Sequence, residues 1–258
     1  PVVSDARLAL ETMMDWAKSR STKAWRDTIA AWEQENPLAM RDDKGMSPQM
    51  IMEAINQAYD SGVVVTDVGQ HQMWASQFLA FGPEKRFITS GGLGTMGFGF
   101  PAAIGAKIGC PDADVVCISG DGGMQMNIQE LATAVVEEVP VTVCILNNYY
   151  LGMVRQMQQL FYGKRYSGTC LRRRKSCPAD CKGPNKNCPP YEPDFVKLAE
   201  SYGAHGIRVT EASEIAPALA QAKANTDAPT IIEFLIATDE LVLPMVKSGN
   251  PMSEMILR

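Results

Sequence analysis

Two short apolar runs, separated by a segment of helix length, constrain the fold of this chain more than any other feature. Residues 115–119 and 141–146 are rich in β-branched side chains. Runs that are apolar on both faces are typical of interior strands in a parallel sheet. Asn127 followed by Glu130 resembles a helix-capping signal, and Pro140 ends the segment. Apolar residues recur between them at helical spacing, which predicts a βαβ unit: Ile128, Leu131, Ala132, Val135, Val136 and Val139.

Polar residues follow both predicted strands, Asp121 after the first and Asn148 after the second. A right-handed crossover brings the two strand ends to one rim of the sheet, where open α/β sheets bind ligands. Mg²⁺ prefers hard oxygen ligands and often keeps a phosphate among them. Gly122 and Gly123 let the backbone approach a phosphate at a helix N-terminus. The sequence predicts a metal–diphosphate site, with a plain polar turn after each strand as the alternative.

The composition limits the classes of partner. With 258 residues and 46% hydrophobic content, the chain can bury one substantial core. A net charge of −5 favours neither nucleic acid nor an anionic membrane as a partner. We see no apolar run of about 18 residues and no secretory signal, so we expect a cytoplasmic protein without a membrane span. Because the chain begins at Pro1, we also expect it to be part of a longer protein.

The order of predicted elements indicates a helical attachment followed by one α/β domain. Residues 6–35 have helical patterning, with Trp25, Ile29 and Trp32 on one stripe, and residues 36–48 are typical of a linker. We place the boundary between residues 1–46 and 47–258. A helix is predicted from Ser47 to Tyr59. Strands are predicted at 62–68, 86–89, 115–119, 141–146, 206–210 and 229–236. The expected fold is therefore a three-layer, doubly wound, mainly parallel sheet of about six strands with helices on both faces.

The chain has two histidines, and their positions suggest different roles. His71 follows the first predicted strand on the same rim and is a candidate phosphate contact, whereas His205 is assigned to a surface turn.

Residues 90–109 contain glycines in the spacing GxGxxG, which makes a dinucleotide-binding oxidoreductase the alternative function. That fingerprint requires a strong preceding strand and a later acidic residue, and here the strand is short and Asp112 and Asp114 precede the next strand. We therefore expect Gly92, Gly94 and Gly97 to pass close to a cofactor, with Met96 beside it or in the core.

Several stretches together resemble one enzyme family. They are GQHQMW at 69–74, GGLGTMG at 91–97, GDG at 120–122, MNIQEL at 126–131, the asparagine pair at 147–148 and VLPM at 242–245. In this order they are similar to the C-terminal, thiamine-diphosphate-binding domain of acetolactate (acetohydroxyacid) synthase, over nearly the whole chain. The thiamine motif is general, so another thiamine-diphosphate-dependent 2-oxo acid decarboxylase or carboligase is a second alternative.

The resemblance implies a cofactor, a metal and a reaction. Mg²⁺ would be held by Asp121, Asn148 and the backbone carbonyl of Tyr150. Met96 would support the bent form of thiamine diphosphate. The enzyme would decarboxylate pyruvate and add the hydroxyethyl unit to a second 2-oxo acid, pyruvate or 2-oxobutyrate, in branched-chain amino acid biosynthesis. The implied cofactor contacts are Gln70, His71, Gly94, Met96, Gly120, Asp121, Gly122, Gly123, Asn148, Tyr150, Leu151, Gly152 and Met153.

The chain departs from this family in two respects. The family's activating glutamate lies in an N-terminal domain, and only residues 1 to about 20 resemble the end of the FAD-binding middle domain. We therefore expect the chain alone to be catalytically incomplete and to need the N-terminal domain of a second subunit, in a homodimer or larger assembly. A regulatory small subunit is a further candidate partner. Met157 stands where many relatives have a tryptophan that shapes the second-substrate pocket, so a preference for 2-oxobutyrate is not expected.

A cysteine-rich, basic insert at 166–191 also departs from the family pattern. Cys170, Cys177, Cys181 and Cys188 lie there among Arg172, Arg173, Arg174, Lys175, Lys182 and Lys186. The spacing lacks the paired CxxC of common zinc sites, so three alternatives stay open: a zinc or iron–sulfur site, reversible disulfides, or a reduced solvated loop. We hypothesise a lid whose thiol state controls substrate access. The other cysteines, Cys110, Cys117 and Cys144, are predicted to be structural.

Overall fold

A computed structural model describes residues 1–40, 45–181, 183, 185–191 and 193–257. Residues 41–44 of the predicted linker and Lys182 of the insert therefore lie outside the described residues. The chain divides into two compact units, Pro1–Ala39 and Met40–Arg258. The first contains α1 (Ala6–Met14) and α2 (Lys23–Glu35), neither of which buries a residue. The aspartate before α1 caps it through the amides of residues 7 and 8, while the rings of Trp25 and Trp32 in α2 meet edge to face, 5.5 Å apart.

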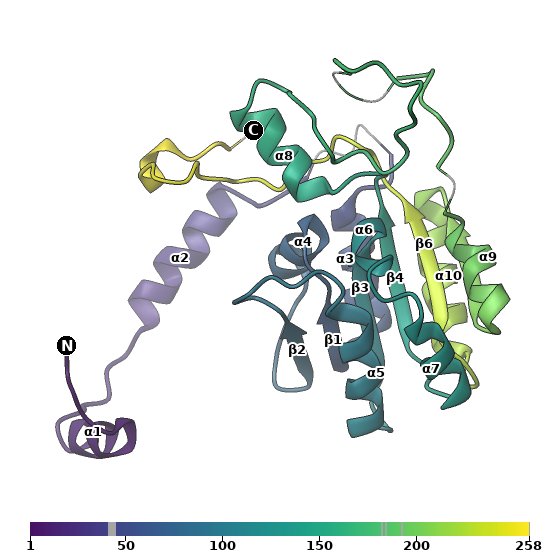
Figure 1. The fold of residues 1–258 in the computed structure, drawn as a ribbon. Coiled ribbons are helices and arrows are strands. Elements are labelled where there is room, and N and C mark those ends of the chain that lie inside the picture. The colour runs from purple at the N-terminus through teal and green to yellow at the C-terminus, as the bar shows by residue number, and fades with distance from the viewer. Residues whose placement is uncertain (41–44, 182, 184, 192, 258) are drawn as a thin grey trace. The chain divides into compact units, whose positions relative to one another are not determined.

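The second unit is built on a parallel sheet. Within the described residues, six strands form it in the order β2-β1-β3-β4-β6-β5, and every pairing is parallel (Figure 1). The chain leaves β1 towards β2 on one side and then returns to place β3 on the other side, so the strand order reverses at β1. Ligands of open α/β sheets bind at such a switch point. The bounds confirm the predicted strands: β1 Gly62–Thr66, β2 Lys85–Thr89, β3 Val115–Gly120, β4 Thr142–Asn147, β5 His205–Val209 and β6 Thr230–Leu235.

Helices cover both faces of the sheet, which confirms the three-layer fold (Figure 1). On one face α3 (Pro48–Ala58), α4 (Gln70–Phe78) and α10 (Ile215–Ala224) bury a core that includes Trp74 and Phe234. On the other face α5 (Gly99–Gly109), α7 (Glu130–Val136) and α9 (Phe195–Tyr202) bury a core that includes Phe100 and Leu131. Successive residues of β1 and β3 belong alternately to the two cores, as strand geometry requires.

The remaining short elements lie at strand ends or near the chain's end. They are α6 (Asp121–Met124), α8 (Gly152–Phe161), and the 3₁₀ turns η1 (Ala212–Glu214) and η2 (Met252–Glu254). The helix predicted from Ser47 to Tyr59 is α3, and the side chain of Ser47 caps it by accepting from the backbone of Met50. None of the helices in the described part of the chain is long and apolar enough to cross a bilayer.

Two local predictions were wrong. Asn127 does not cap the crossover helix, because its amide donates to the carbonyl of Gly97 at 2.7 Å. The helix itself is only Glu130–Val136, and Glu138 with φ 52° interrupts it before Pro140. The predicted apolar stripe is confirmed in part: Ile128, Leu131, Val135 and Val139 pack in the core on this face of the sheet, whereas Ala132 and Val136 are exposed.

His205 is also placed differently from the prediction. It begins β5 rather than lying in a turn, and its Nε2 is 2.9 Å from Asp227. The preceding helix is capped by Gly203 in the left-handed conformation, and β5 begins two residues later.

Candidate functional site

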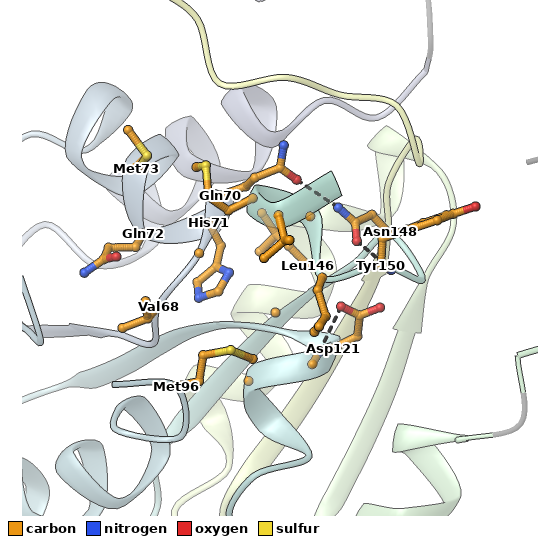
Figure 2. A pocket seen from close by; sticks show the side chains of 18 of the residues that line it. Val68, Gln70, His71, Gln72, Met73, Met96, Asp121, Leu146, Asn148 and Tyr150 are labelled. Atoms are coloured by element: carbon orange, nitrogen blue, oxygen red, sulfur yellow. Dashed lines mark hydrogen bonds between the residues drawn. The ribbon is translucent and has the colours of Figure 1, made fainter. Parts of the chain in front are cut away.

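A cavity of about 280 Å³ lies at the carboxyl ends of β1, β3 and β4 (Figure 2). Every cofactor contact that the family resemblance implied lines it, whereas Gly92 and Gly97, which we also expected beside the cofactor, do not. The structure adds Val68, Gly69, Gln72, Met73, Trp74, Leu146 and Val154 to this lining. Met157 and the four cysteines of the insert are not among the lining residues. Segments from residue 68 to residue 154 therefore converge on one cavity at the strand switch point.

Asp121 has an unsatisfied carboxylate oxygen in this cavity. It is the first residue of α6, directly after β3, and its side chain is buried. Oδ1 accepts a hydrogen bond from the amide of Gly122 at 2.9 Å, whereas Oδ2 has no partner. Removal from water raises the pKa of Asp121 to about 7, against the opposing effect of nearby backbone N–H groups. A buried carboxylate oxygen without a partner is uncommon, and a bound cation would satisfy it.

Asn148 lines the same cavity as Asp121 (Figure 2). Its Oδ1 accepts from the amide of Tyr150 at 3.0 Å, and its Nδ2 donates to Oε1 of Gln70 at 3.0 Å. Asn147 instead donates to Glu233, at 2.7 Å. The two adjacent asparagines therefore serve different purposes: Asn147 anchors the turn and Asn148 faces the cavity. A carboxylate, an amide oxygen and a backbone carbonyl at this turn are hard oxygen donors that fit Mg²⁺.

His71 lies in the first turn of α4 rather than in the loop after β1, because the helix begins at Gln70. The ring is buried, and its Nε2 has no partner. Burial lowers the pKa of His71 to about 4, although the nearby Asp67 acts in the opposite direction. The ring is therefore neutral at pH 7 and offers a hydrogen bond rather than a positive charge. Gly69 precedes it with φ 145°, a conformation suited to glycine.

Asp67 is a site residue that the sequence reasoning missed. It is buried just after β1, and its carboxylate accepts from the amides of Gly97 at 2.9 Å and Gly99 at 2.8 Å. These bonds hold the glycine-rich loop, and with it Met96, against the sheet. A Cβ at position 99 would lie 2.6 Å from the Asp67 nitrogen, so a glycine is required there. An acidic residue closing an apolar strand, as Asp121 does, was the signal that could have identified it.

A second missed group supports the turn after β4. Glu233 is buried on β6, accepts from Asn147, and accepts from Nε of Arg208 at 2.8 Å. Arg208 also donates to Asp194 at 2.6 Å. Arg208 and Glu233 are opposite each other in the β5–β6 pairing. Only the strand pairing brings these residues together, and no local sequence pattern indicated it.

The insert does not assemble a four-thiolate metal site in this structure. Its four cysteines are free. Across the described residues, no three or more His, Cys, Asp or Glu side chains form a group that could hold a metal ion. Cys170 instead forms a β-bridge with Tyr150, beside the cavity. Its neighbour Arg172 lies over the ring of Tyr149, 4.8 Å from the ring centroid, so part of the basic run packs on aromatic rings.

Comparison with known proteins places this geometry in a family. Residues 67–234 match the model described as thiamine pyrophosphate enzyme, C-terminal TPP binding domain. The acetolactate synthase large subunit of Corynebacterium glutamicum is 40% identical over 262 residues, which cover 98% of this chain and 40% of that protein. The corresponding subunit of Cyanidium caldarium is 38% identical over 263 residues, covering 99% and 42%. The chain thus spans about two fifths of the length of these curated relatives.

A solved structure is similar as well. The Rhodococcus jostii RHA1 thiamine diphosphate-dependent 4-hydroxybenzoylformate decarboxylase superposes with a TM-score of 0.65 and 27% sequence identity. The match covers 79% of this chain and 35% of that one.

Proposed function

This chain belongs to the thiamine pyrophosphate enzymes as their C-terminal TPP-binding domain, and from that premise we propose that the cavity holds the diphosphate of the cofactor together with Mg²⁺. One observation carries the proposal: the cavity collects every contact residue that the resemblance implied, and three of its lining residues have a buried polar atom without a partner, Oδ2 of Asp121, Nε2 of His71 and Nε1 of Trp74. Asp121, Asn148 and the carbonyl of Tyr150 would hold the metal. His71 would bind the diphosphate, and Gln70 would contact it through its main chain, because protein groups engage its side-chain amide.

The chain's own residues contribute position and electrostatics. When bound, thiamine diphosphate supplies the carbanion chemistry that removes carbon dioxide from a 2-oxo acid and transfers the remaining unit. Met96, held by the loop that Asp67 anchors, would support the cofactor's ring system. A Cβ at Gly122 would come 2.6 Å from a methyl carbon of Leu151, so this lining position requires glycine, and its backbone would face the phosphate. Together these residues would orient the cofactor and keep its phosphate end out of bulk water.

We further propose that the whole protein is an acetolactate synthase that joins two 2-oxo acids. The identities of 38–40% with acetolactate synthase large subunits over nearly the full chain support this. The other wall of the active site would come from the N-terminal domain of a second subunit, and FAD would bind the middle domain of the full-length protein. Because Met157 replaces the pocket tryptophan, we expect pyruvate to compete effectively with 2-oxobutyrate as second substrate. Product ratios of the full-length enzyme and its Met157→Trp variant would test this, and unchanged ratios would contradict it.

The cofactor proposal can be tested on the purified chain by calorimetry. Thiamine diphosphate should bind in Mg²⁺ and not in EDTA, and NAD⁺ should not bind in either buffer. Asp121→Ala should abolish binding because it removes a metal ligand, whereas Asp112→Ala removes an exposed carboxylate outside the cavity and serves as the matched control. Binding of NAD⁺, or thiamine diphosphate binding that is equal in EDTA, would contradict the proposal.

A further inference from the structure

Three buried side-chain amides connect the C-terminal segment to the proposed metal ligand Asn148. They belong to Gln156 on α8, Gln70 on α4 and Asn148 itself, and each is at most 5% exposed. We propose that Gln156 is a positioning residue: through Gln70, it fixes the orientation of the Asn148 amide so that its oxygen, and not its NH₂ group, faces the metal. This inference rests on the proposed function, because it concerns the same cation site.

The orientation of Gln156 is set by the backbone of Val242. Oε1 of Gln156 accepts from the Val242 amide at 2.8 Å, and Nε2 donates to the Val242 carbonyl at 2.8 Å. A backbone N–H only donates and a carbonyl only accepts. If the Gln156 amide were flipped, its NH₂ group would face the Val242 N–H and its oxygen would face the Val242 carbonyl. Neither hydrogen bond could then form. The C-terminal segment allows only one orientation of this side chain.

Gln70 connects Gln156 to Asn148 by hydrogen bonds, so the orientation of the Gln156 amide sets the orientation of the Asn148 amide. Oε1 of Gln156 also accepts from Nε2 of Gln70 at 2.8 Å, and the same NH₂ group donates to the carbonyl of Glu240 at 2.9 Å. Both protons of the Gln70 amide are then used, and its oxygen points to Nδ2 of Asn148. Oδ1 of Asn148 is left facing the other way, where it accepts from Tyr150 and retains a lone pair for a cation.

Burial makes it costly to reverse any of these three amides. Because the three side chains are buried, a reversed amide would leave several donors and acceptors unpaired, which is costly in a medium of low dielectric constant. The close approach of the amides also depends on Gly152. A Cβ at that position would collide with Oε1 of Gln70 and lie 2.7 Å from Nδ2 of Asn148. Four separate segments of the chain thus converge to set the direction of one ligand oxygen.

Gln156→Met tests the inference, because methionine keeps the length of the side chain and removes both its donor and its acceptor. Outer-shell partners of metal ligands contribute about 10–100-fold to metal affinity, so we expect the Mg²⁺ concentration needed for thiamine diphosphate binding to rise by about that factor. Gln158→Met is the matched control on the same helix. It loses bonds to Ser167 and Thr169, outside the cavity, and should change the Mg²⁺ requirement by less than about twofold.

A second measurement separates this inference from the proposed function. Hydrogen exchange of the Gln70 side-chain NH₂, followed by NMR without cofactor, should be slow in the native chain and in Gln158→Met, and faster in Gln156→Met. Gln156→Glu should restore slow exchange, because its carboxyl oxygen still accepts from Gln70. An unchanged Mg²⁺ requirement in Gln156→Met, or fast exchange in the native chain, would overturn the inference. Slow exchange in a native chain that binds no thiamine diphosphate would instead overturn the proposed function.

Discussion

Replacing Asp121 with asparagine should stabilise the cofactor-free chain at high pH while removing the negative charge from the proposed metal site. The carboxylate is buried, one oxygen lacks a partner, and burial raises its pKa from 3.8 to about 7. Between these values the native state retains a proton that the unfolded chain has released. The free energy of unfolding therefore falls as pH rises through this window.

The size of the effect follows from the pKa difference. A shift of about three units, at about 1.4 kcal/mol per unit, corresponds to as much as ~4 kcal/mol of stability that is present below pH 4 and lost by pH 7. Asparagine does not titrate, so this loss should be missing in Asp121→Asn. Burial lowers the pKa of His71 to about 4, so the native state loses stability as pH falls below the usual histidine pKa. This loss occurs in both proteins and therefore cancels in the difference between them.

Denaturant unfolding of both proteins between pH 4 and pH 8, in EDTA, measures this difference. The variant should gain stability relative to the native chain as pH rises, with most of the gain between pH 4 and pH 7. Asp112→Asn, which removes an exposed carboxylate, is the control for the change in net charge. A difference between Asp121→Asn and the native chain that is flat across this range would refute the reasoning. Saturating Mg²⁺ with thiamine diphosphate should reverse the order of stability, since a carboxylate gains more from a bound cation than a neutral amide does.

Three further predictions concern the same site and its support. Gly152→Ala should weaken Mg²⁺-dependent thiamine diphosphate binding at least about tenfold, because its Cβ would displace Gln70 and Asn148; calorimetry showing native affinity would contradict this. In an NMR titration of the cofactor-free chain, His71 should titrate with a midpoint near pH 4, and a midpoint above 6 would show that its ring is not buried as described. Glu233→Ala should destabilise the chain by about 3 kcal/mol in denaturant unfolding, because the buried amide of Asn147 and the guanidinium of Arg208 lose their acceptor; a loss below about 1 kcal/mol would contradict it.

The sequence alone determined the layers, the strands and the location of the site. An apolar run such as 115–119 can be recognised as a strand from its own few residues. Once the strands are parallel, the polar residues that follow them must meet at one rim of the sheet. For this reason Asp121 and Asn148 could be placed together before any coordinates were known. The short crossover helix was predicted less well, because its length depends on Asn127 bonding to Gly97 and on the conformation of Glu138.

Only the tertiary structure decided which way each polar group points. Asn147 and Asn148 are identical neighbours in sequence, yet one anchors to Glu233 and the other faces the cavity. The bond between Gln70 and Gln156 joins residues 86 positions apart, and such a pairing leaves no periodic trace in either segment. Burial likewise sets the pKa values of Asp121 and His71, because desolvation depends on what the whole fold packs around a group rather than on its sequence neighbours.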